Sequence, residues 1–156
     1  MKDKIKVQDS KFYSEYFDNL QEEDIYVFLK AKSQEIWKSL FDEKAKSYFQ
    51  LPNNNWIIKS KEIHLGTWID DYNDDISKNV SNKLENTINW KDDDKILFCI
   101  NDSSIIESSW LNFKTSWIDF LSCEDDAVLI VNPNNLKTAL IFYSIGTFFK
   151  LEREIS

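Results

Sequence analysis

Residues 104–122 have the sequence SIIESSWLNFKTSWIDFLS, which carries the strongest periodic pattern of apolar side chains in the protein. Large apolar residues recur there at spacings of four, three, four and three, and they are Ile106, Trp110, Phe113, Trp117 and Phe120. Such spacings place side chains on one face of an α-helix. We therefore predict an amphipathic helix from about Ser104 to Ser122, with its aromatic face buried.

The segments around this helix have the composition of strands. Residues 95–100, 127–131 and 138–144 are runs of aliphatic and aromatic side chains, and residues 147–151 follow a bend at Gly146. Short connections between the last strands favour antiparallel pairing. We expect residues 1–156 to form a single α+β domain, with an antiparallel sheet of about three to five strands backed by helices.

The first half of the chain has weaker patterns. We predict a helix over residues 33–49 with Ser33 as its N-cap, and a short strand at residues 56–58. A second helical stripe repeats every four residues, at Ile76, Val80, Leu84 and Ile88. The start of the chain lacks an apolar signal region, and no apolar run is long enough to cross a bilayer. We expect a cytoplasmic protein that does not contact membranes.

The net charge of −8 comes from one segment. Residues 67–126 hold 14 acidic side chains against five lysines, whereas residues 1–66 hold 11 of each sign. Many of these acids are consecutive, at residues 70–71, 74–75, 92–94 and 124–126. A field of this sign attracts a basic partner and repels nucleic acid.

The acidic run at residues 70–75 does not have the pattern of a calcium loop. If the loop begins at Asp71, Ile76 occupies the position of the required glycine, and Asn82 occupies that of the bidentate glutamate. A solvated acidic loop is the better interpretation.

Residues that could perform catalysis are scarce. His64 is the only histidine, and neither Cys99 nor Cys123 lies in a recognised nucleophile or metal-ligand motif. The two cysteines are expected to be reduced thiols, because nothing in the sequence signals export. With only two glycines, the chain cannot form a glycine-rich phosphate loop. We predict no enzymatic activity, no metal site and no cofactor.

Six tryptophans are available for a core or for an interface. Trp110 and Trp117 lie on the apolar helical stripe and are expected in the core. Trp56, Trp68 and Trp90 each stand beside a polar or acidic segment, where an indole serves equally well as a loop anchor or as a binding hot spot.

Residues 96–151, with the helical pattern Trp-x-x-Phe-x-x-x-Trp-x-x-Phe-Leu at 110–121, resemble a small bacterial family of single-domain proteins of uncharacterised function. As a type, a small acidic α+β protein with many tryptophans and no catalytic set also resembles the immunity proteins of contact-dependent growth inhibition systems. That resemblance implies binding to one cognate toxin domain, often a nuclease, and its inhibition. It assigns no functional residue.

Our first hypothesis is therefore an immunity protein that neutralises a basic toxin domain, expected to be a nuclease, through its acidic middle segment. The predicted partner-binding residues are Asp70, Asp71, Asp74, Asp75, Asp92, Asp93 and Asp94, with Trp68 and Trp90 as aromatic anchors. Two alternatives remain open on the sequence: a metal-assisted hydrolase that uses the clustered carboxylates, and a generic acidic protein-interaction module.

Overall fold

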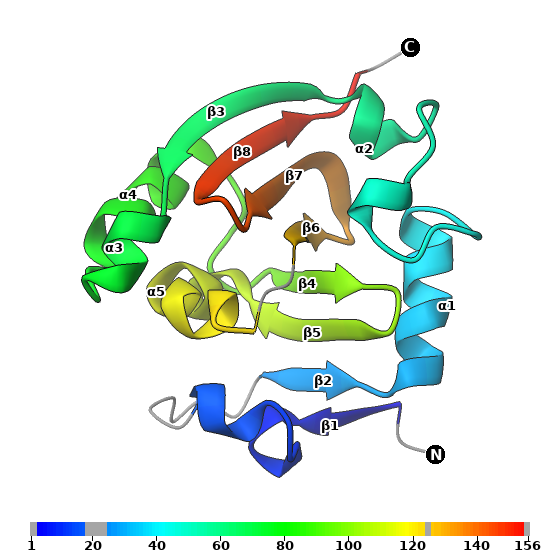
Figure 1. Cartoon of the computed structure of the whole chain (residues 1–156), viewed down its shortest axis with the longest axis horizontal. Coiled ribbons are helices and arrows are strands. Elements are labelled where there is room, and N and C mark those ends of the chain that lie inside the picture. Colours follow the sequence, from blue (N-terminus) through cyan, green and yellow to red (C-terminus); the bar gives the residue numbers. More distant parts are fainter. Residues whose placement is uncertain (1–2, 18–24, 124–125, 155–156) are drawn as a thin grey trace.

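A computed structural model describes residues 3–17, 25–123 and 126–154. Within these ranges all strands belong to one antiparallel sheet of eight, in the order β1-β2-β5-β4-β6-β7-β8-β3 (Figure 1). The strands are β1 (Lys4–Lys6), β2 (Tyr26–Phe28), β3 (Lys61–Thr67), β4 (Lys95–Asn101), β5 (Ser104–Ser109), β6 (Ala127–Asn132), β7 (Asn135–Tyr143) and β8 (Thr147–Glu152).

Helices lie on both faces of this sheet (Figure 1). The α-helices are α1 (Lys30–Leu40), α2 (Trp56–Lys59), α3 (Ile69–Asn73), α4 (Lys78–Thr87) and α5 (Trp110–Leu121), and the short 3₁₀ helices are η1 (Val7–Asp9), η2 (Ser14–Phe17) and η3 (Tyr48–Gln50). Helices α3, α4 and α5 cover one face together with η1 and η2, while α1, α2 and η3 pack on the opposite face.

The central strands alternate between two separate cores. On β4, Phe98 contributes to the core beneath α5, and its neighbour Leu97 contributes to the core beneath α1. All six residues of β6 are buried. An antiparallel sheet often keeps one face in water, but here both faces of the centre are covered. This burial explains why β4 and β6 are continuous apolar runs in the sequence rather than alternating ones.

The predicted sheet of three to five strands is wrong, because the sheet has eight. Strands β1 and β2 contain only three residues each, which is too short for a recognisable alternating pattern. Strand β3 is a polar edge strand with exposed lysine, glutamate and histidine side chains. Strand β5 was missed because its residues fell inside the predicted helix. The strands predicted at residues 95–100, 127–131 and 138–144 are confirmed by β4, β6 and β7, and the segment after the bend at Gly146 forms β8.

The helix predicted from Ser104 begins six residues later. Ser109 caps α5, because its Oγ accepts a hydrogen bond from the backbone N–H of Asn112 at 3.1 Å. Ile106 instead lies in β5, opposite Phe98 of β4. The apolar spacing continued across the strand–helix junction because Ile106 and Trp110 enter the same core. Periodicity alone does not separate the two elements.

Three other local predictions also need correction. The helix over residues 33–49 is α1, which ends at Leu40, and Ser33 lies buried inside it rather than at its N-cap. The segment Trp56–Ile58, predicted as a strand, belongs to α2, where the side chain of Asn55 accepts a hydrogen bond from Ile57 N–H. For the stripe at residues 76–88, α4 buries Val80 and Leu84 but begins after Ile76.

The β7–β8 turn is joined closely to α3 at Gly146. The φ angle of Gly146 is +111°, and the backbone carbonyl of Gly146 accepts a 2.7 Å hydrogen bond from Trp68 N–H. A Cβ at this position would lie 2.7 Å from Cβ of Ile69. Glycine is therefore required both by the backbone angle and by the approach of α3.

We expect Gly146→Ala to lower the free energy of unfolding by about 1–3 kcal/mol, because it adds backbone strain and a clash with Ile69. Urea denaturation would measure this loss. Gly66→Ala is the matched control, since Gly66 has a φ of +143° but its nearest neighbour, Phe148 Cε1, would be 3.8 Å from the new Cβ. Equal losses in the two variants would show that the contact with α3 contributes nothing.

Candidate functional site

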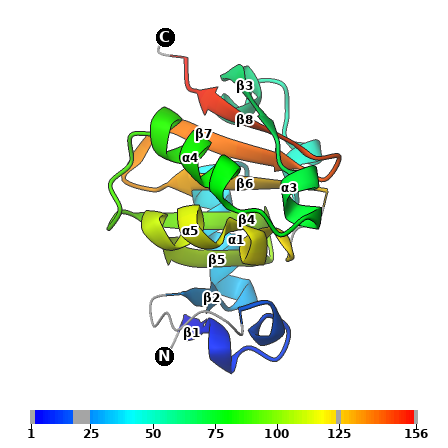
Figure 2. The ribbon, with the colours of Figure 1, turned by 90° about the vertical axis from the view of Figure 1, so that its left-hand side faces the viewer.

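The predicted acidic residues lie on the helical layer formed by α3, α4 and α5. Asp70 and Asp71 belong to α3, Asp74 and Asp75 follow it, and residues 92–94 lie in the loop between α4 and β4. The ten residues of α4 separate the two groups by about 15 Å along the helix axis. Figure 2 shows α3 beyond one end of α4, and the loop that leads to β4 leaves from the other. The acidic residues of the middle segment therefore form two separate groups in the structure.

The group at α3 is largely exposed and forms no ion pair with a described residue. Asp70, Asp74 and Asp75 are exposed, Asp71 is half-buried, and none of the ion pairs among the described residues involves them. Burial raises the pKa of Asp119 on α5, and the negative charge of Asp75 raises it further. The negative field at this end of the layer is consequently not neutralised within the described structure.

Most carboxylates of the second group, at residues 92–94, form contacts within the fold. Lys114 of α5 is only 5% exposed, and its ammonium forms ion pairs with Glu85 of α4 and, at 2.6 Å, with Asp92. Burial alone would lower the pKa of Lys114, but the hydrogen bonds and charges of Asp92 and Glu85 outweigh it and raise that pKa. Asp92 therefore holds its loop against α4 and α5.

Asp94 also has a structural role. One of its carboxylate oxygens accepts hydrogen bonds from Lys91 N–H at 3.0 Å and from the Asn132 side-chain amide at 3.1 Å. These bonds close the turn and connect it to the end of β6. Asp93 is exposed and forms no ion pair with a described residue, so it is the carboxylate of this loop that remains available to a partner.

Trp68 and Trp90, the predicted aromatic anchors, are buried in the folded chain. Their exposed fractions are 2% and 5%. The indole N–H of Trp68 donates a 3.0 Å hydrogen bond to the carbonyl of Tyr143, and Trp90 packs edge-to-face against Trp110 with ring centroids 5.0 Å apart. Both indoles serve as loop anchors in the core, and neither is presented on the surface to a partner.

Two isoleucines that are not among the predicted partner-binding residues are exposed in segments next to α3. Ile145, in the β7–β8 turn, is 82% exposed, and Ile76, directly after Asp75, is 44% exposed. The turn is held beside α3 by the Trp68–Gly146 hydrogen bond. The only sequence signal for Ile145 is that an isoleucine precedes a turn glycine. We refer to Asp70, Asp71, Asp74, Asp75, Ile76 and Ile145 as the acidic corner.

The remaining candidates for chemistry lie on different elements, with Cys99 on β4, Cys123 after α5 and His64 on β3. Burial raises the pKa of Cys99, and burial together with the charge of Asp119 raises the pKa of Cys123 to about 12, so both thiols are protonated at neutral pH. His64 is exposed on edge strand β3, in edge-to-face contact with Phe149. In the described parts of the chain, no three His, Cys, Asp or Glu residues are grouped so that they could hold a metal ion.

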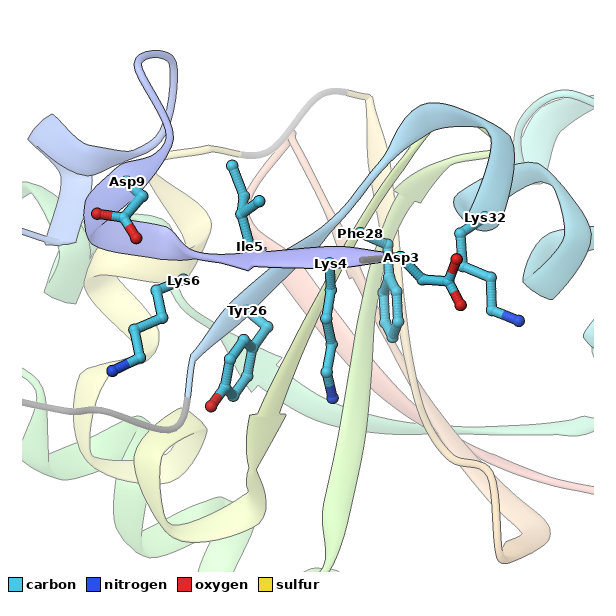
Figure 3. Close-up of a pocket in the computed structure, with 8 residues that line it drawn as sticks. All are labelled: Asp3, Lys4, Ile5, Lys6, Asp9, Tyr26, Phe28 and Lys32. Carbon is cyan, nitrogen blue, oxygen red and sulfur yellow. The ribbon is translucent and has the colours of Figure 1, made fainter. Parts of the chain in front are cut away.

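A groove lies at the opposite end of the sheet, near β1. It encloses about 540 Å³ and is lined by Asp3, Lys4, Ile5, Lys6, Asp9, Tyr26, Phe28 and Lys32. Figure 3 shows the side chains of Lys4, Lys6, Tyr26 and Phe28 on one side of the β1–β2 pair, whereas Ile5 points to the other side. A second hollow of about 330 Å³ shares Lys4 and Tyr26 and extends to Asp93 and Lys95. No sequence pattern indicates this groove, because β1 and β2 contain only three residues each.

The fold and these surfaces define a protein with a two-sided antiparallel sheet, an acidic corner and a lysine-lined groove. The chain belongs to the family described as "Protein of unknown function (DUF2947)", whose model matches residues 13–150. This agrees in a general sense with the resemblance to an uncharacterised family, although the match extends well beyond residues 96–151. Comparisons with curated proteins and with solved structures find no match. In the described residues no helix has the length and apolarity needed to cross a membrane.

We expect Asp119→Asn to raise the free energy of unfolding at pH 7. Because the pKa of Asp119 is higher in the folded state, the folded state binds the proton more tightly, and the charged carboxylate destabilises the fold at neutral pH. The gain should shrink as the pH falls through this pKa, where the wild-type carboxyl is also protonated. Urea denaturation over a range of acidic to neutral pH measures it. A gain that is independent of pH would contradict this electrostatic origin.

Proposed function

We propose that this protein is a non-enzymatic binding protein whose acidic corner engages a basic surface of another protein. The observation that carries this proposal is the exposure of Ile145 in a turn bonded to the start of α3, together with four carboxylates on and after α3 that form no ion pair with a described residue. Burial of an exposed apolar side chain at an interface contributes to affinity, whereas the surrounding charges chiefly steer association.

The partner that best fits this surface is a bacterial toxin domain with a basic cleft. A nuclease needs positive charge to hold its nucleic-acid substrate, and a net charge of −8 favours rapid association with such a cleft. On this proposal the protein is a cytoplasmic immunity protein that blocks its cognate toxin. The revised interface replaces Trp68 and Trp90 with Ile76 and Ile145, and it retains Asp93 as a separate exposed carboxylate.

The first test is a calorimetric titration against the C-terminal domain of the protein encoded immediately upstream. We expect tight binding that weakens as salt increases, and we expect Ile145→Asp to reduce the affinity at least about tenfold. Phe49→Asp is the matched control, because Phe49 is 61% exposed and lies on η3, on the opposite face of the sheet. The control variant should bind like the wild type.

Charge reversal tests the electrostatic part of the proposal separately. We expect the combined variant Asp70→Lys, Asp71→Lys, Asp74→Lys and Asp75→Lys to associate more slowly and to lose most of its salt dependence. Unchanged affinity in this variant and in Ile145→Asp would place the interface elsewhere. Failure to bind the upstream toxin domain, with tight binding to an unrelated basic protein at the same corner, would favour a generic interaction module.

A further inference from the structure

Edge strand β1 presents backbone groups that form no hydrogen bond with another described residue. Its pairing with β2 places Lys4 opposite Phe28 and Lys6 opposite Tyr26. The flanking bonds, Leu29 N–H to the Asp3 carbonyl at 2.8 Å and Val7 N–H to the Ile25 carbonyl at 2.9 Å, show that odd-numbered residues bond to β2. In an antiparallel ladder the alternate residues direct their N–H and C=O groups away from that partner. Lys4 and Lys6 therefore direct their backbone groups toward the open side of β1.

The side chains of the same two residues line the groove. Lys4 and Lys6 extend to one side of the sheet together with Tyr26 and Phe28, as Figure 3 shows. The Lys4 ammonium contacts Glu107 at 2.8 Å and lies 4.6 Å from the centre of the Tyr26 ring. The ammonium groups of Lys6 and Lys32 form no ion pair with a described residue. Positive charge is thus available beside the open backbone edge.

We propose that β1 binds an extended acidic segment of another protein as an added strand of the sheet. The backbone groups of Lys4 and Lys6 would pair with those of the segment, and their ammonium groups would face its carboxylates. Side chains two residues apart on a strand lie about 6.6–6.8 Å apart on the same face. The preferred segment therefore carries acidic residues at alternate positions, with an apolar residue between them that packs on the side of Ile5.

Other occupants of this edge fit less well. In an antiparallel pair of two copies of β1, lysines would face lysines, and such like-charge contacts are unfavourable. A single-stranded nucleic acid requires open aromatic faces for base stacking, but the Lys4 ammonium already lies over the Tyr26 ring.

The probe for this proposal is a capped peptide of alternating glutamate and valine, labelled with a fluorophore and titrated into the full chain. We expect saturable binding that weakens with salt. The same peptide with lysine in place of glutamate should not bind, and a peptide of equal composition with its glutamates in one block should bind more weakly. No binding of the alternating peptide would overturn the proposal and leave the lysines as a guard against edge-to-edge aggregation.

Two substitutions at Lys6 separate charge from strand pairing. Lys6→Ala removes only the ammonium and should weaken binding about two- to fivefold. Lys6→Pro also removes the outward N–H, and the φ of −62° at this position already suits proline. We expect Lys6→Pro to bind a further two- to tenfold more weakly, as about one lost hydrogen bond predicts. Lys38→Ala, on the exposed surface of α1, is the control and should bind normally.

Equal affinities of Lys6→Ala and Lys6→Pro would overturn strand addition. Amide hydrogen exchange of the wild-type protein gives a test that does not depend on the proline variant folding. The peptide should slow exchange at the amides of Lys4 and Lys6, and unchanged exchange at both would contradict the proposal. Binding of oligouridylate in preference to the peptide, or dimerisation through β1, would contradict it as well. Because β1 lies far from the acidic corner, loss of toxin binding in Ile145→Asp should leave peptide binding intact.

Discussion

The burial of the central strands on both faces is the constraint on which the rest of the structure depends. Strands β4, β6 and β7 carry large apolar side chains toward both sides, so each side requires a helical layer that excludes water. The aromatic face of α5 supplies one cover, and α1 with its Trp37 supplies part of the other. The surfaces that remain accessible to a partner are the edges of the sheet and the outer sides of the helices.

The indoles connect these layers through backbone hydrogen bonds. Trp37, Trp56, Trp68 and Trp117 donate to the carbonyls of Ala45, Leu40, Tyr143 and Ser77, respectively, at 2.8–3.0 Å. Each bond fixes a loop or a helix end while the ring fills the core, which is why tryptophan is used in place of a purely aliphatic residue. Most of the tryptophans therefore have structural roles. The proposed binding surfaces consist of smaller exposed side chains.

The two proposed binding surfaces differ in sign and lie at different ends of the sheet. The acidic corner is built where the β7–β8 turn meets α3, and the groove is built where β1 and β2 extend the sheet beyond α1. Lys114 lies in the helical layer between them, where its single positive charge offsets part of the negative charge of Asp92 and Glu85. A protein of net charge −8 can therefore present positive charge locally to one acidic segment.

The sequence by itself determined the elements whose burial is encoded locally, such as β4, β6, β7 and the aromatic face of α5. It also located the excess negative charge. Only the tertiary structure decided the size of the sheet, because β1 and β2 are defined by hydrogen bonds to residues far along the chain rather than by their own patterns. It likewise decided that Asp92 is paired and that Ile145 is exposed, since burial and ion pairing depend on which distant segment covers a side chain.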